Sequence, residues 1–245
     1  MIKVHFLSKE KRGIFVRRYV LISDIHGELE MFEQLLEKMQ YNPAEDQLVL
    51  LGDYVDRGPN SRGVLNKVME LKEEGAIVLR GNHDDMLLAA AKGEENAWER
   101  WWKNGALPTL LSYDPTITEQ VLPDTEEFQK HIAFIEELDY YVETEDYIFV
   151  HGGVDPDTPV AETDPYVLIW IRDKFHKGYH GDKTVVFGHT TTPNLHDDPE
   201  NFNVFFGENR IIGIDGGAVY GGQLNGLELP SKKQSHIKNT TLLKK

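Results

Sequence analysis

Six short apolar runs in this chain each stop at a polar residue that has a glycine close by. The polar residues are aspartate, histidine or asparagine, whose side chains can bind transition metals. Ligands of open α/β sheets bind at the carboxyl ends of the strands, where the chain must turn tightly. Six repeats of this arrangement therefore indicate one shared metal site. The polar residues are Asp24, Asp53, Asn82, His151, His189 and Asp215.

The first junction reads Asp24-Ile25-His26-Gly27. In a continuing strand, residues two apart point to the same face, so we expect Asp24 and His26 to lie side by side. A carboxylate and an imidazole on one face make half of a divalent-metal site. Taken alone, this short motif fits a structural or capping role equally well.

The second junction, residues 52–58 with the sequence GDYVDRG, is the most specific of the six. Two carboxylates three apart, an arginine and two bracketing glycines are costly to place on one turn, because the acids repel and the glycines lose entropy. This cost disfavours the alternative, a solvated turn without a ligand. We expect Asp53 to bridge two cations and the planar guanidinium of Arg57 to bind two phosphate oxygens.

The later junctions add further donors. Asn82 and His83 follow the third run, and because adjacent residues at a strand end diverge, we expect the two to have different roles. His151 and His189 each stand next to glycine after a later run. Either histidine alone is more typical of a core or surface residue. Chance does not explain why so many possible metal ligands follow apolar runs in one chain.

Six expected ligands are more than one tetrahedral zinc ion uses, and they fit two metals about 3.5–4 Å apart that share a carboxylate. Calcium and magnesium prefer shells of oxygen alone, so three histidines favour manganese, with iron or zinc as alternatives. The expected ligands are Asp24, His26, Asp53, Asn82, His151 and His189.

The elements that position these residues alternate between strand and helix from residue 19 to residue 92. Apolar residues at helical spacing predict helices at 28–39 and 61–74. Such alternation is typical of βαβ units with a largely parallel sheet. The strands are expected at 19–23, 47–51 and 76–80.

We expect a single domain at 19–230, in which 94–137 form a mainly helical insertion and the second half is more purely β. Three closely spaced tryptophans in the insertion are more typical of a core than of a lid over a site. Residues 1–18 are interpreted as an extension with a hairpin, and the basic segment 231–245 as a frayed tail. Further strands are expected at 140–150, 184–187, 203–206, 210–214 and 222–229.

The composition is that of a soluble globular protein, with 245 residues, 40% of them hydrophobic and 27% charged. It contains no cysteine, which excludes disulfides and thiolate ligands and favours the cytoplasm. No apolar run is long enough to predict a membrane span. The net charge of the whole chain is −15, and the body between its two basic ends is more acidic still, which disfavours a nucleic-acid partner and favours a bound cation.

The motifs resemble those of the phosphoprotein-phosphatase family of binuclear metallophosphoesterases. A DxHG element, GDxVDRG, GNH followed by an acid, HGG and a late GH occur here in that order between residues 24 and 189. Within this family the chain is most similar to the phage-lambda type of serine/threonine phosphatase. That similarity lies in residues 82–86, 101–105, 169–172 and 214–219.

The resemblance implies a four-layer αββα sandwich and a division of the ligands between two metals that share Asp53. His83, positioned by Asp56, would be the general acid, and Arg57 and Arg172 would hold the phosphate. A metal-bridging water would attack phosphorus directly, without a covalent intermediate. One metal would be held by Asp24, His26 and Asp53, and the other by Asp53, Asn82, His151 and His189.

Two positions depart from the family pattern. Ser23 stands where glycine is usual, and Asp84 stands where protein phosphatases usually have glutamate. Asp84 also resembles the diadenosine tetraphosphate hydrolases of the same family, so it leaves the substrate class open. Asp215 is interpreted as a support for a ligand, with simple turn formation as the alternative.

The leading hypothesis is a manganese-dependent phosphomonoesterase that acts on phosphoserine and phosphothreonine, and also on phosphotyrosine and small aryl phosphates. Its partners would be a phosphorylated protein or a small phosphoester, and neither nucleic acid nor a membrane. The alternative is a dinucleoside-polyphosphate hydrolase. A third hypothesis, a metal-binding regulatory protein without turnover, is disfavoured by the intact His83, Asp56, Arg57 and Arg172.

Overall fold

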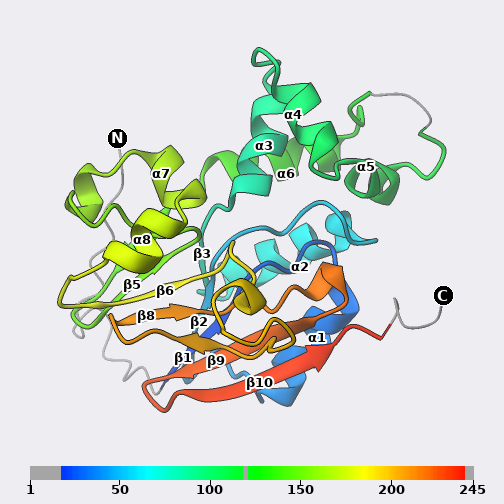
Figure 1. Cartoon of the computed structure of the whole chain (residues 1–245). Coiled ribbons are helices and arrows are strands. Elements are labelled where there is room, and N and C mark those ends of the chain that lie inside the picture. Colours follow the sequence, from blue (N-terminus) through cyan, green and yellow to red (C-terminus); the bar gives the residue numbers. More distant parts are fainter. Residues whose placement is uncertain (1–17, 118–120, 241–245) are drawn as a thin grey trace.

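The computed structural model describes residues 18–117 and 121–240, which form two five-stranded mixed sheets with helices around them (Figure 1). The hairpin expected in the N-terminal extension falls outside the described residues, apart from Arg18. Within the described ranges, no helix is both long and apolar enough to cross a lipid bilayer.

The first sheet has the strand order β10-β9-β1-β2-β3. Its strands β1, β2 and β3 are parallel and are connected by helices α1 and α2, as the alternating pattern predicts, whereas β9 is antiparallel to both of its neighbours. The elements are β1 (Arg18–Ile22), α1 (Leu29–Lys38), β2 (Asp46–Leu50), α2 (Ser61–Glu73), β3 (Ile77–Val78), β9 (Gln223–Leu229) and β10 (Lys233–Lys238).

The second sheet has the order β4-β5-β6-β8-β7, with β5, β6 and β8 parallel and an antiparallel strand at each edge. Short helices lie between β5 and β6 and between β6 and β7, and η3 follows β8 in the connection to β9 of the first sheet. The elements are β4 (Tyr141–Glu143), β5 (Tyr147–Val150), η1 (Val160–Glu162), α7 (Pro165–Trp170), α8 (Asp173–Gly178), β6 (Thr184–Phe187), η2 (Thr192–Asn194), β7 (Phe205–Phe206), β8 (Ile211–Gly213) and η3 (Ala218–Tyr220).

Three apolar layers hold the sheets and helices together. Alternate residues of a strand point to opposite faces, so Leu21 of β1 and Val186 of β6 meet in the layer between the sheets. Ile22 faces the helices on one outer side, and Phe187 packs with α7 and α8 on the other. The expected four-layer αββα sandwich is therefore confirmed (Figure 1).

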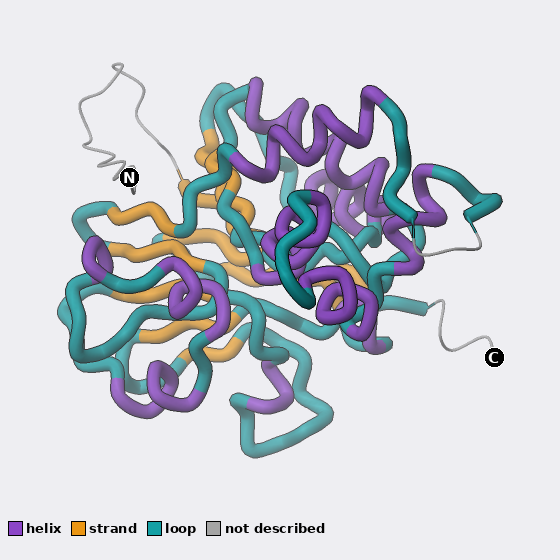
Figure 2. Tube along the Cα trace, turned by 90° about the horizontal axis from the view of Figure 1, so that it is seen from above, coloured by secondary structure: helices purple, strands orange, loops and turns teal. Residues whose placement is uncertain are grey.

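Four helices between β3 and β4 form a separate helical layer at one end of the molecule (Figures 1 and 2). Trp101 is fully buried there, with Trp98 and Trp102 packed around the same core cluster. The helices are α3 (Asn82–Ala91), α4 (Ala97–Lys103), α5 (Leu107–Tyr113) and α6 (Glu126–Glu136).

The prediction of a frayed tail at 231–245 is wrong for its first part. Residues 233–238 form β10, which pairs antiparallel with β9, and Asn239 donates a hydrogen bond to the carbonyl of Ala218 (2.9 Å). Only Ser235 of this strand is buried, so no apolar alternation marks it in the sequence. Main-chain hydrogen bonds hold β10 at the sheet edge, and these are independent of side-chain type.

Candidate metal centre and active site

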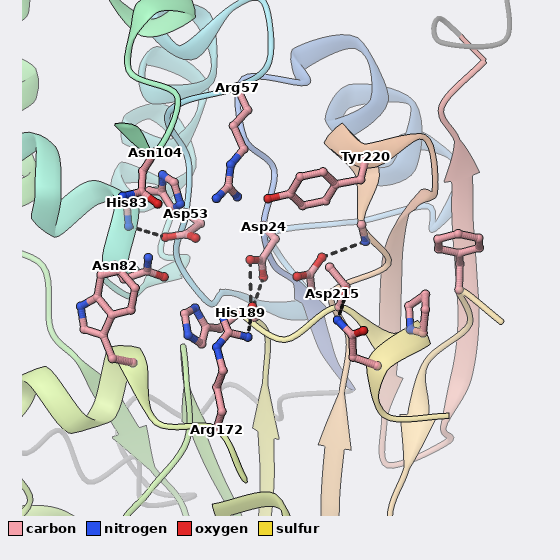
Figure 3. A pocket seen from close by; sticks show the side chains of 16 residues that line it. Asp24, Asp53, Arg57, Asn82, His83, Asn104, Arg172, His189, Asp215 and Tyr220 are labelled. Carbon is pink, nitrogen blue, oxygen red and sulfur yellow. Dashed lines mark hydrogen bonds between the residues drawn. The ribbon is translucent and has the colours of Figure 1, made fainter. Parts of the chain in front are cut away.

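The predicted polar residues come together where the strands of both sheets end. A cavity of about 430 Å³ opens at this end, and Figure 3 shows the side chains that line it. Both sheets contribute, because the loops after β1, β2 and β8 and the start of α3 meet the loop after β6. The predicted site residues that line it are Asp24, Asp53, Arg57, Asn82, His83, Arg172, His189 and Asp215.

Two further histidines are buried beside Asp53, and their ring orientations are fixed. Nδ1 of His26 lies 2.7 Å from the carbonyl oxygen of Val55, and Nδ1 of His151 lies 2.9 Å from that of Leu51. A carbonyl can only accept, so Nδ1 carries the proton and donates in each ring. Nε2 is then the atom that would bind a metal once it carries no proton, in place of its contacts with Arg57 in His26 and with Asn82 in His151. This is the usual arrangement of ligating histidines.

The surroundings of the His189 ring show whether this residue is suited to bind a metal. Its Nε2 is buried and has no hydrogen-bond partner among the residues that the structure describes. Leaving a buried polar atom unpaired costs about 1–3 kcal/mol, and a cation would remove this cost. Burial also lowers the pKa of His189 well below its usual value, so the ring is neutral and can act as a ligand.

The donor atoms form two groups that share one carboxylate. Asp53, His26 and His83 place one donor each within 4.8 Å of one another, and so do Asp53, His151 and His189. The amide oxygen of Asn82 lies 2.9 Å from Nε2 of His151, so it joins the second group. This donor set fits two divalent cations, and Asp53 would be common to the residues that hold each of them.

Asp24 differs from the expectation in its local structure. β1 ends at Ile22, and both Asp24 (φ 53°) and His26 (φ 43°) adopt left-handed backbone conformations, so the expected continuing strand is wrong. The backbone turns because it pairs with the next loop: N–H of Asp24 donates to the carbonyl of Gly52 (3.1 Å). The Asp24 carboxylate still lines the cavity beside Asp53 (Figure 3), and its role as a ligand stays a prediction.

Two of the glycines at the strand ends are required by close packing. A Cβ atom on Gly81 would lie 2.1 Å from Oδ1 of Asp53, and one on Gly188 would lie 2.1 Å from Oδ2 of Asp24. Both distances are far shorter than a carbon–oxygen contact allows. The glycines beside the polar residues therefore let the loops approach one another until the carboxylates converge.

His83 and Asp56 form a buried pair next to the donor groups. Nδ1 of His83 donates to Oδ2 of Asp56 at 2.7 Å, which leaves Nε2 as the atom that can exchange a proton with a ligand in the cavity. Asp56 also accepts hydrogen bonds from Trp101 and Thr109. The sequence analysis did not find Thr109, because an isolated threonine 53 residues away carries no signal of this contact.

Arg57 and Arg172 reach the cavity from opposite sides (Figure 3). The Arg57 guanidinium lies 5.1 Å from the centre of the Tyr220 ring, and its Nη1 donates to Nε2 of His26 at 2.9 Å. Arg172 donates to the Thr190 hydroxyl at 2.8 Å. Two guanidinium groups facing one cavity can bind the oxygens of a phosphate from two sides.

The comparisons with known proteins agree with this geometry. A model of the calcineurin-like phosphoesterase family matches residues 17–223. The chain belongs to this family. Its members include the phosphoprotein-phosphatase relatives expected from the motifs, and the protein is thus a metallophosphoesterase, a hydrolase that uses divalent metals.

The relatives of this chain are named for two different activities, cleavage of dinucleoside tetraphosphates and dephosphorylation of proteins. The asymmetrical bis(5'-nucleosyl)-tetraphosphatase PrpE of Oceanobacillus iheyensis is 30% identical over 240 residues, or 87% of this chain and 89% of the relative. Serine/threonine-protein phosphatase 1 of Salmonella typhimurium is 27% identical over 218 residues, covering 85% and 90%. The crystal structure of a provisionally assigned diadenosine tetraphosphatase has a TM-score of 0.71, with 22% identity and coverage of 98% and 100%.

The departure of this metallophosphoesterase at Asp84 lies outside the lining of the cavity. Asp84 is fully buried, and its carboxylate accepts hydrogen bonds from the backbone of Asp53 (2.8 Å), Tyr54 (3.0 Å) and Gly81 (2.9 Å). Burial raises its pKa to about 7. Asp84 is not among the residues that line the cavity, so any effect of its identity on the substrate would have to act through the loop that it holds.

In this metallophosphoesterase, Ser23 and Asp215 both lie in loops of the site and each makes a hydrogen bond there. The Ser23 hydroxyl donates to Oδ2 of Asp24 at 2.6 Å, which a glycine at this position could not do. Asp215 accepts the backbone N–H of Gly217 at 2.8 Å and lies close to Asp24 at the cavity wall (Figure 3). Asp215 therefore forms the turn that was the alternative interpretation, and its expected support of a ligand stays a prediction.

Proposed function

We propose that this metallophosphoesterase hydrolyses dinucleoside polyphosphates such as diadenosine tetraphosphate. The observation that carries this proposal is the composition of the cavity beyond the charged residues. A group of five uncharged lining residues includes two aromatic rings and is here named the aromatic arm. The arm consists of Thr191, Pro193, Asn194, Phe202 and Tyr220.

The aromatic arm is suited to a flat, uncharged group attached to a phosphate. Gln223 and Asn225 fix the backbone of Phe202, since both amides donate to its carbonyl oxygen (3.1 and 2.8 Å). The Tyr220 ring is 60% exposed. Stacking of a base on an aromatic ring contributes about 1–3 kcal/mol, and a cavity of about 430 Å³ is within the range of small-molecule sites.

The relatives support the same substrate class. The Oceanobacillus protein, at 30% identity over most of both chains, is named for cleavage of bis(5'-nucleosyl) tetraphosphates. The leading hypothesis from the sequence, a protein phosphatase, becomes the second candidate. Two observations favour it: the Salmonella relative, and the His83–Asp56 pair, because a serine alkoxide is a poor leaving group that needs a proton.

In this proposal Asp24, His26, Asp53, Asn82, His151 and His189 hold two divalent cations, manganese being the first choice and iron or zinc the alternatives. When bound, such cations activate water and neutralise phosphate charge. Arg57 and Arg172 bind the oxygens of the reacting phosphoryl group and keep it in line with the leaving oxygen. His83, oriented by Asp56, donates a proton from Nε2 to that oxygen as the bond to phosphorus breaks.

A substrate panel tests the proposal on the manganese-loaded protein. We expect kcat/KM for diadenosine tetraphosphate to exceed that for a phosphoserine peptide at least about tenfold, the effect of one stacking contact. Phe202→Ala should lower the ratio of kcat/KM for the dinucleotide to that for p-nitrophenyl phosphate by a similar factor. The control is Phe206→Ala, which removes a part-exposed ring on β7 that does not line the cavity.

Three results would speak against this assignment. A preference for the phosphopeptide would favour the protein-phosphatase candidate. An unchanged ratio in Phe202→Ala would remove the aromatic arm as the base site. Absence of manganese-stimulated hydrolysis of every substrate would favour the regulatory protein without turnover.

A further inference from the structure

The turn between α4 and α5 is bonded to the loop that carries Asp56 and Arg57. Nε1 of Trp101 donates to both carboxylate oxygens of Asp56, at 2.9 and 3.0 Å. The carbonyl of Gly105 accepts the backbone N–H of Arg57 at 3.0 Å. Thr109, on α5, also contacts Asp56, so this turn and its flanking residues, 101–109, hold the loop through side chains and backbone together.

Thr109 forms two opposite hydrogen bonds with Asp56. Its hydroxyl donates to Oδ1 of Asp56 at 2.8 Å and accepts the backbone N–H of Asp56 at 2.8 Å. A hydroxyl can donate and accept at once, whereas a methyl group of the same size can do neither. This pair therefore fixes the side chain and the backbone of Asp56 relative to each other.

The Asp56 carboxylate depends on these donors, because it is fully buried. His83, Trp101 and Thr109 are its side-chain donors in the described part of the chain. The backbone of Asp56 (φ 72°) is also in the left-handed region, which a non-glycine residue keeps only when its surroundings hold it there. Without Trp101 or Thr109, the carboxylate would be free to rotate away from His83.

We propose that Trp101 and Thr109 are positioning residues for acid catalysis, which orient His83 through Asp56. The inference rests on the proposed function, since it assumes that His83 protonates the leaving oxygen. This role gives the helical layer a part in the reaction. It also explains why Trp101, Gly105 and Thr109 all contact the loop that carries Asp56 and Arg57. A purely structural role of the same residues in the core is the alternative to be excluded.

The test uses the dependence of rate on the leaving group. Good leaving groups need little protonation, so loss of acid catalysis lowers kcat more as the pKa of the leaving alcohol rises. The manganese-loaded protein is assayed with aryl phosphates from p-nitrophenyl to phenyl and with a phosphoserine peptide. His83→Asn serves as the reference for complete loss of the acid.

Thr109→Val and Thr109→Ser form the matched pair. We expect Thr109→Val to lower kcat by about 10²-fold with the phosphoserine peptide, the lower end of what a general acid contributes, and progressively less with better leaving groups. Thr109→Ser keeps the hydroxyl and should restore the wild-type dependence. Trp101→Phe, which keeps an aromatic ring without Nε1–H, should behave like Thr109→Val. Trp98→Phe, on the same helix and packed against Trp101, should behave like wild type.

Each outcome decides a separate point. If His83→Asn shows a leaving-group dependence and neither Thr109→Val nor Trp101→Phe does, the positioning role is wrong although the acid role stands. A uniform loss with every substrate, or a loss that Thr109→Ser does not restore, would leave only the structural role. If His83→Asn itself shows no dependence on the leaving group, the acid role and this inference fail together, while metal-dependent hydrolysis stands. Thermal unfolding of each variant identifies a folding defect, and the Trp101 variant then replaces a misfolded Thr109 variant.

Discussion

Asp53 and His151 determine the charge state of the metal centre. Burial alone would raise the pKa of Asp53, but His151, His83 and His26 around it lower that pKa well below its usual value. Burial likewise opposes the charge on His151, yet the Asp53 carboxylate raises its pKa to about 9. The two residues therefore form a buried ion pair, and His151 must lose its proton before Nε2 can bind a cation.

This ion pair predicts that manganese binding depends on pH. The pKa of His151 lies above the usual histidine value of about 6.5, so the ring keeps its proton until about pH 9. Affinity for Mn²⁺ should rise about tenfold per pH unit between these values and then level off, because binding displaces one proton. Calorimetric titration of the chelator-treated protein with MnCl₂ at several pH values measures this, and a flat profile over that range would contradict the ion pair.

At the scale of elements, the first turn of α3 joins two loops of the site. Gly81 caps this helix and contacts Asp53, while Asp84 accepts three backbone N–H groups from the loop after β2 and from Gly81 itself. A carboxylate at a helix N-terminus is also favoured by the helix dipole. Asp84 therefore helps to fix the position of the loop after β2 relative to α3, together with the bond from the His83 backbone to Asp53 (2.8 Å).

Asp84→Ala should lower the free energy of unfolding by about 2–4 kcal/mol, because three buried N–H groups lose their acceptor. The control is Asp85→Ala in the same turn, whose side chain is 30% exposed and pairs with Arg80 at 3.3 Å. That change should cost less than about 1 kcal/mol. Urea unfolding measures both, and equal losses would mean that the backbone bonds of Asp84 contribute little.

The elements differ in how far the sequence determines them. Helix α1 has its apolar residues at helical spacing, so its bounds were predicted within one residue at each end. β10 was missed because main-chain pairing holds it and only Ser235 is buried. The ligand set follows from residue types at strand ends, but the contacts of Thr109 with Asp56 follow from the packing of α5, which a local pattern does not contain.

At the scale of the whole molecule, the site exists only when the two sheets are packed together, and its loops are strained. Of the ten non-glycine residues with positive φ among those described, six are predicted site residues. Each such conformation costs about 1–2 kcal/mol for a residue with a side chain. The packing of the three apolar layers must outweigh this cost. The six are Asp24, His26, Asp53, Asp56, Arg57 and His189.

A pair of substitutions at Arg57 (φ 70°) measures the strain. Both Arg57→Gly and Arg57→Ala remove the guanidinium, but only glycine adopts positive φ without a steric cost, so the glycine variant should be about 1 kcal/mol more stable. Lys67, in the middle of α2, provides the reverse case. There the glycine variant should be about 1 kcal/mol less stable than the alanine variant, as in other helices. Thermal or urea unfolding compares the four proteins, and the same sign at both positions would refute the strain.

The left-handed conformations also bear on how this chain would change over generations if its activity were no longer selected. Glycine at any of the six positions would relieve strain while removing a proposed ligand, a proposed acid partner or a proposed phosphate contact. Because most proteins are held only just above the stability they need, such replacements would be favoured as soon as catalysis ceased to matter. A descendant that has lost its activity should therefore be recognisable by glycines at these positions on an otherwise intact sandwich.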